Sequence, residues 1–213
     1  MMISSSALRC SAALACAAGA LLWRAQDDED ALVSGERGLP ISSSAPSFMP
    51  FHITGPHAGR KACPLCVYGL GPQLQVWLEE SKLPFLADFV KEVDGLAQRS
   101  PLEPGQKKDG FTPYLVVSST KGGQLSPGSV KLIKSWKLKR VFATSVPGWE
   151  DPETARLYGH SSKDKPASRA YLVINRRVFK RWENVDQRQV QTIASALKQG
   201  RGFVSSHDLV DSQ

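Results

Sequence analysis

Residues 63–78 read CPLCVYGLGPQLQVWL, and the rest of the chain is best interpreted outward from this stretch. Its first half holds Cys63 and Cys66 at CxxC spacing, within a segment rich in glycine and proline. Its second half, residues 73–78, alternates and is rich in strand-forming residues, so it predicts a strand. A CxxC pair serves as a redox dithiol, as half of a metal site or as a small structural disulfide.

Outward from this strand, the sequence predicts an alternation of helices and strands. Residues 83–97 carry apolar side chains on one helical face, and Tyr114–Val117 is a continuous apolar run typical of a buried strand. Further patterns predict a helix at 127–139, a strand at 141–146, a short helix at 151–159, a strand at 170–174 with a second hairpin arm at 178–182, and a helix at 186–198. Right-handed crossovers would make the early strands parallel, place helices on both faces of the sheet and leave the hairpin at one edge.

The composition is that of an ordinary globular protein. The chain has 213 residues, of which 41% are hydrophobic and 22% charged, enough for one domain, predicted at 48–203, to bury a core without a disulfide framework. The net charge of +7 favours an anionic partner or surface but does not specify an activity. Basic side chains recur on the helix at 127–139 and on the hairpin, with no RNA-binding aromatic pattern beside them, so no nucleic-acid partner is expected.

The amino-terminal segment predicts export. Arg9 is followed by the uncharged run Cys10–Trp23, which is shorter than the roughly 20 residues of a membrane span and matches the apolar region of a signal peptide, predicted as residues 1–25. The alternative is an uncleaved anchor, the one contact with a membrane that the sequence suggests. Residues 26–47 predict a flexible linker and residues 204–213 a polar tail. Either way, the domain is expected in the periplasm or outside the cell, where disulfides persist.

Two motifs resemble the thioredoxin-like superfamily, and in particular secreted bacterial redoxin-type proteins. The first reads F-x-P-x-H-x-T-G-P and then C-P-x-C-x-Y-G, and its matching residues are Phe48, Pro50, His52, Thr54, Gly55, Pro56, Cys63, Pro64, Cys66, Tyr68 and Gly69. The second, Asp151–Asn175, is similar to a peroxiredoxin-type pattern in which a short helix ends in tyrosine-glycine and an Arg-Ala pair enters a strand. The resemblance implies an α/β fold: a thioredoxin-like three-layer sandwich with a central mixed sheet.

The position of the cysteines departs from the thioredoxin pattern. In thioredoxins the CxxC follows a strand and opens the next helix, whose amino end lowers the thiol pKa. The equivalent stretch here, Trp77–Leu83, contains no cysteine, because the CxxC precedes the strand instead. No peroxidatic cysteine pattern is present, and Pro166 is the nearest candidate for the proline that usually faces the dithiol.

The redox interpretation assigns catalytic roles to Cys63 and Cys66. Cys63 is expected to be the attacking thiolate, because the first cysteine of a CxxC is usually the more exposed and because Arg60 and Lys61 would favour its charge. Cys66 would then resolve the mixed disulfide. Such a protein needs no resident cofactor, and its partners would be protein thiols, protein disulfides or a redox partner protein.

Two other interpretations of the same loop remain open. His52, His57, Cys63 and Cys66 form a possible tetrahedral set with two sulfur and two nitrogen ligands for zinc or copper. The pair Cys63 and Cys66 is alternatively a structural disulfide that holds the loop on the sheet, on a domain without catalytic activity.

Overall fold

The computed structural model describes residues 38–68, 70–99, 110–119, 124–147 and 168–207, with side chains described to residue 200. The predicted signal peptide, most of the predicted linker, the short helix at 151–159, Pro166 and the end of the tail lie outside these ranges. Within them, no helix has the length and apolar character needed to cross a membrane.

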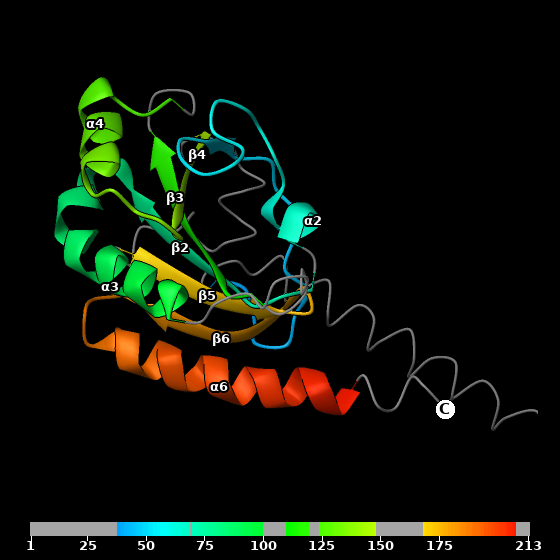
Figure 1. Ribbon diagram of the computed structural model, residues 1–213. Helices are drawn as coiled ribbons and strands as arrows, with labels where there is room; N and C mark the ends of the chain where they lie inside the picture. Colours follow the sequence, from blue (N-terminus) through cyan, green and yellow to red (C-terminus); the bar gives the residue numbers. More distant parts are fainter. Residues whose placement is uncertain (1–37, 69, 100–109, 120–123, 148–167, 208–213) are drawn as a thin grey trace, which may run out of the picture.

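The described strands form one mixed sheet of six strands in the order β1-β4-β3-β2-β5-β6 (Figure 1). The parallel centre consists of β2 (Gln73–Glu79), β3 (Thr112–Ser119) and β4 (Phe142–Pro147). The short β1 (Phe51–His52) pairs antiparallel with β4 at one edge, and the hairpin of β5 (Ser168–Ile174) and β6 (Arg177–Glu183) completes the other. The predicted parallel centre and antiparallel edge hairpin are therefore confirmed.

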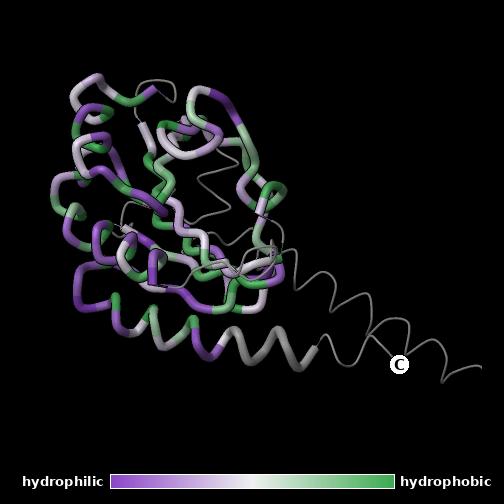
Figure 2. The backbone as a smooth tube through the Cα atoms, in the orientation of Figure 1, coloured by the Kyte–Doolittle hydropathy of each residue, from purple (hydrophilic) through white to green (hydrophobic). Residues whose placement is uncertain are grey.

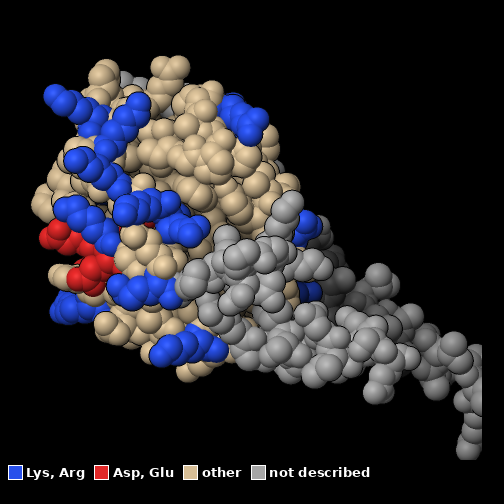
Figure 3. Space-filling view, viewed as in Figure 1, with Lys and Arg blue, Asp and Glu red and all other residues tan. Residues whose placement is uncertain are grey.

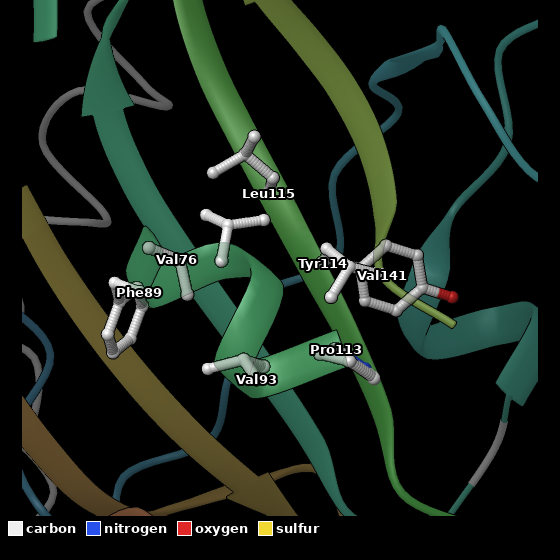
Figure 4. Close-up of a pocket in the computed structure, with 8 residues that line it drawn as sticks. Val76, Phe89, Val93, Pro113, Tyr114, Leu115 and Val141 are labelled. Atoms are coloured by element: carbon white, nitrogen blue, oxygen red, sulfur yellow. The ribbon is translucent and has the colours of Figure 1, made fainter. Parts of the chain in front are cut away.

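Three long helices cover one face of the sheet. They are α3 (Ala87–Gln98), α4 (Pro127–Ser135) and α6 (Gln189–His207), and α3 and α6 run side by side in Figure 1. Their apolar side chains join those of the strands in the larger core cluster, and hydrophobic residues are concentrated along the central strands in Figure 2. Phe89 and Val93 of α3 pack on Val76 and Leu115, leaving no room for a water molecule between them (Figure 4). This dense packing fixes the positions of β2 and β3.

The opposite face carries a second core cluster beneath an irregular segment. The strand residues on this face include Trp77, Tyr114 and Tyr171, and the Tyr114 ring in Figure 4 points away from the side chains of α3. The chain from Leu39 to Phe48 and the short helix α2 (Pro64–Tyr68) cover these rings. Layers on both sides of a central mixed sheet agree with the predicted three-layer sandwich.

Three predicted helix boundaries were wrong for identifiable reasons. The expected start at Leu83 falls in a 3-10 helix, η1 (Glu80–Leu86), and α3 begins only at Ala87, because Pro84 has no N–H to donate to an α-helical ladder. The expected end at 139 is too late, since Lys137 adopts a positive φ of 53° just after α4 ends. Finally, the helix expected at 186–198 begins at Gln189 and continues to His207 as α6, and Gly200 within it lies against Ile174.

Candidate functional site

Cys63 and Cys66 lie at the start of α2 with opposite exposures. Cys63 is 6% exposed and belongs to the core cluster on this face, together with Leu65 and Phe48. Cys66 is exposed, and the two cysteines are free thiols. The expectation that Cys63 would be the more accessible thiol was therefore wrong, because the turn of α2 directs Cys63 and Leu65 inward and leaves Cys66 on the surface.

The two thiols interact directly. The backbone N–H of Cys66 donates to the Cys63 Sγ at 3.3 Å, and the Cys66 thiol hydrogen-bonds to the same sulfur. This hydrogen bond and the charge on Cys63 raise the pKa of Cys66, while Ser47 and the Arg176 guanidinium act in the opposite direction.

The dithiol lies at the amino end of the parallel strands. Cys63 packs with Tyr114 and Phe142, which stand near the starts of β3 and β4. At the opposite, carboxyl end of β2, Glu80 accepts a hydrogen bond from the Ser126 N–H at 2.7 Å. Burial raises the Glu80 pKa, but hydrogen bonds from Ser126 and Ser129 outweigh it and hold the pKa below its usual range. The carboxyl end of β2 thus carries a carboxylate where the thioredoxin pattern places its cysteines.

His52 lies beside this region in the edge strand β1. It is 1% exposed, and its Nε2 donates to the Ala62 carbonyl at 3.1 Å. Its Nδ1 has no hydrogen-bond partner among the described residues. Burial lowers the pKa of His52, which favours the neutral ring with a lone pair on Nδ1.

His57 approaches His52 without completing a metal site. The two rings meet edge to face with centroids 5.5 Å apart, and the His57 Nδ1 accepts a hydrogen bond from Arg60 at 2.6 Å. Within the described residues, no three histidine, cysteine, aspartate or glutamate side chains are gathered closely enough to hold one metal ion. The predicted set of His52, His57, Cys63 and Cys66 is therefore not assembled as a metal centre here.

Aromatic rings that the sequence analysis did not assign to the site connect the histidines to the thiols. Tyr68 of α2 lies 5.5 Å from Tyr114 and 5.8 Å from Phe142, measured between ring centroids, and 6.3 Å from His57. Burial, with the neighbouring Tyr68 and Cys63, raises the pKa of Tyr114 and keeps its hydroxyl protonated. Strand alternation places Tyr114 on this face of β3, but only the packing shows that it reaches the cysteines.

The same arrangement of sheet and helices is found in other solved structures. A putative thiol:disulfide interchange protein DsbE from Chlorobium tepidum superposes with a TM-score of 0.52 at 14% sequence identity, covering 75% of this chain and 99% of the other. The fold is thioredoxin-like. The pneumococcal exposed lipoprotein thioredoxin of Streptococcus pneumoniae is also similar, with a TM-score of 0.50, 13% identity, and coverage of 72% and 99% of the two chains.

A third thioredoxin-like structure comes from a protein with a different role. BsSco, a member of the Sco family of cytochrome c oxidase assembly proteins with an identified disulfide switch, gives a TM-score of 0.51 at 12% identity. It covers 77% of this chain and 96% of its own. No protein-family model matches the chain, and no curated protein matches its sequence. At these identities, the likeness shows the fold alone.

Proposed function

We propose that this protein exchanges thiols and disulfides with other proteins through Cys63 and Cys66. The observation that carries the proposal is the arrangement of the pair: two adjacent thiols share a hydrogen bond, and one of them opens onto the surface. A dithiol of this kind cycles between two thiols and one disulfide with little rearrangement of the backbone. The exposed thiol gives a partner access that a purely structural pair does not need.

Two further observations support redox exchange over the other interpretations. Solved structures with this fold include proteins named as thiol:disulfide interchange proteins and a Sco protein with a disulfide switch. The four residues of the metal interpretation, by contrast, are not gathered around a common centre in the described chain. Export to the periplasm or the cell exterior, inferred from residues 1–25, would place the dithiol where partner proteins form disulfides.

Redox titration of the purified full chain, combined with elemental analysis, tests the proposal. We expect two thiols that convert reversibly to one disulfide, with a reduction potential above about −300 mV. Matched Cys63→Ser and Cys66→Ser variants should each lose this transition while keeping the fold.

The competing interpretations predict different results. A stoichiometric zinc or copper ion that is lost in Cys66→Ser would replace the redox proposal with metal binding. A disulfide whose potential lies well below about −300 mV would instead identify a structural bond.

A further inference from the structure

The exposures of the two cysteines determine which sulfur a partner reaches. Thiol–disulfide exchange requires the incoming sulfur to approach one sulfur of the pair directly. Cys63 is enclosed in the core cluster with Leu65 and Phe48, whereas Cys66 lies on the surface. A polypeptide can therefore contact the Cys66 sulfur without any movement of α2.

The hydrogen bonds suit Cys63 to the role of leaving group. Its Sγ accepts the Cys66 N–H at 3.3 Å, a bond that strengthens when the sulfur becomes a thiolate. A thiol whose charged form is stabilised leaves faster from a disulfide. The pKa of Cys66 is raised, first by its hydrogen bond to the Cys63 sulfur, which agrees with this division.

The surroundings of Cys66 are both basic and apolar. Arg176 lies close enough to favour a negative charge on the Cys66 sulfur. It occupies the β5–β6 turn, in which Asn175 and Arg176 have φ angles of 51° and 61°, and the Asn175 N–H donates to the Leu70 carbonyl at 3.1 Å. Val67 and Leu70, on either side of the end of α2, are 45% and 47% exposed.

Arginine is an unusual residue for the second position of this turn. A two-residue turn with positive φ at both positions favours asparagine followed by glycine, and a larger side chain at the second position is strained. The turn nevertheless places an arginine beside Cys66. Strain retained next to a reactive group is a pointer to function.

We infer that partners bond to Cys66 and that Cys63 is the leaving and resolving thiol, the reverse of the order expected from the sequence. This inference rests on the proposed dithiol function. Arg176 acts as a positioning residue, and together with Val67 and Leu70 it favours a partner whose cysteine is flanked by an acidic and an apolar residue.

The exchange is balanced with a partner dithiol as reductant. A partner thiolate attacks the Cys66 sulfur of the Cys63–Cys66 disulfide, a partner–Cys66 disulfide forms, and the Cys63 sulfur leaves as a thiolate. The second partner thiolate then attacks the partner sulfur of that bond and releases the Cys66 thiolate, which takes up a proton from water. Two electrons pass to the protein, and the partner gains a disulfide. In the reverse direction, Cys63 resolves the mixed disulfide.

Mapping the first bond tests the inference on the full chain. The oxidised protein is mixed with a peptide in which a single cysteine stands between leucine and glutamate, and free thiols are then blocked. Because no lysine or arginine separates the two cysteines, fragmentation of the tryptic peptide 62–82 must locate the bond by mass spectrometry. We expect the peptide on Cys66 and the blocking group on Cys63.

Single-cysteine variants provide an independent rate measurement. With the same peptide activated as a 2-thiopyridyl disulfide, Cys63→Ser should react about tenfold faster than Cys66→Ser, because its remaining thiol is exposed. Arg176→Gln should slow the Cys63→Ser reaction by about 1.5- to 5-fold, and a peptide with glutamine in place of glutamate should show a smaller effect. Lys180→Gln, an exposed position further along β6, serves as the matched charge control.

The outcomes separate this inference from the proposed function. A peptide bonded to Cys63, or a faster reaction of Cys66→Ser, would overturn the order of the cysteines while leaving dithiol exchange intact. Failure of both cysteines to form a mixed disulfide, together with no reversible oxidation of the pair, would overturn both.

Discussion

His52 combines deep burial with an unpaired ring nitrogen. Its Nε2 donates to the Ala62 carbonyl, and the His57 and Tyr114 rings stand in T-shaped contact with it, with centroids 5.5 and 6.3 Å away. Protonation of the free Nδ1 would place a charge in this enclosed site, where the Arg60 guanidinium and His57 oppose it. The residue therefore ties the stability of the loop around the cysteines to pH.

Because of His52, the free energy of unfolding is expected to decrease as the solution becomes acidic. Burial lowers its pKa below the 6.5 of an unperturbed histidine, so the unfolded chain takes up the proton before the folded one does. The contribution of neutral His52 to the free energy of unfolding is complete above about pH 6.5 and declines as the pH falls from there toward the lowered pKa. Urea denaturation across this window should show a smaller slope of stability against pH for His52→Gln. Equal slopes in the two proteins would contradict the assignment.

Among the elements, α3 is joined to the segment that precedes β4 by the carboxylate of Asp94. Asp94, on the sheet side of α3, accepts hydrogen bonds from the N–H groups of Lys139, Arg140 and Val141, with distances to Oδ1 of 3.0, 2.6 and 2.8 Å. These groups lie between α4 and β4, where the left-handed Lys137 has already ended the helix. The carboxylate satisfies amides that a continued helix would have paired internally.

Replacing this carboxylate should destabilise the protein strongly. Asp94→Ala leaves the three N–H groups without their acceptor, so the free energy of unfolding is expected to fall by about 2–4 kcal/mol. Asp88→Asn is the matched control: it removes an exposed carboxylate from the same helix, one paired with Lys91 at 3.6 Å, and should cost less than about 1 kcal/mol. Chemical denaturation of both variants measures the difference, and similar losses would refute the role of Asp94.

Many basic side chains lie on the helical side of the molecule. Lysines and arginines in Figure 3 spread over the region of α3 and α4, and the exposed members at and after α4 are Lys131, Lys134, Lys137, Lys139 and Arg140. The dithiol lies on the other face, beside the second core cluster. The local cation relevant to Cys66 is instead Arg176 of the hairpin turn.

For the whole molecule, residues 38–47 are part of the described fold. Leu39 and Ala45 are 2% and 5% exposed, and the N–H groups of Ser42 and Ala45 donate to carbonyls of the β5–β6 hairpin. The Val178 N–H donates back to Ser43, and Arg181 reaches the Leu39 carbonyl at 3.3 Å. The composition of this segment, rich in glycine, proline and serine, did not predict this packing.

Comparing chains that begin at different residues measures how much this packing stabilises the fold. A chain beginning at Phe48, the predicted domain boundary, should be about 2–4 kcal/mol less stable than one beginning at Gly38, because it loses the burial of Leu39 and three backbone hydrogen bonds. Urea denaturation of the two chains provides the comparison. Equal midpoints would show that the segment contributes nothing to stability and would support the boundary at residue 48.

The hydrophobic periodicity of the chain predicted most of its strands and helices. Alternating residues at 73–78 and the apolar run at 114–117 became neighbouring parallel strands, and the arms expected at 170–174 and 178–182 pair as the β5–β6 hairpin. Helix ends were less predictable, because they depend on distant partners. Asp94 accepts hydrogen bonds from the backbone just after α4, and Gly200 lies against Ile174 where α6 continues past the expected end. Local preference identifies such elements, but tertiary contacts set their limits.

By itself, the sequence determined the alternation of strands and helices along the chain, the CxxC pair and its displacement ahead of the first core strand. Only the tertiary structure decided that Cys63 is buried and Cys66 exposed, that His52 keeps a free nitrogen, and that Arg176, in a turn more than a hundred residues later, lies near enough for its charge to act on Cys66. The physical reason is that periodicity is a property of neighbouring residues, whereas exposure and pKa depend on every chain segment that packs around a group.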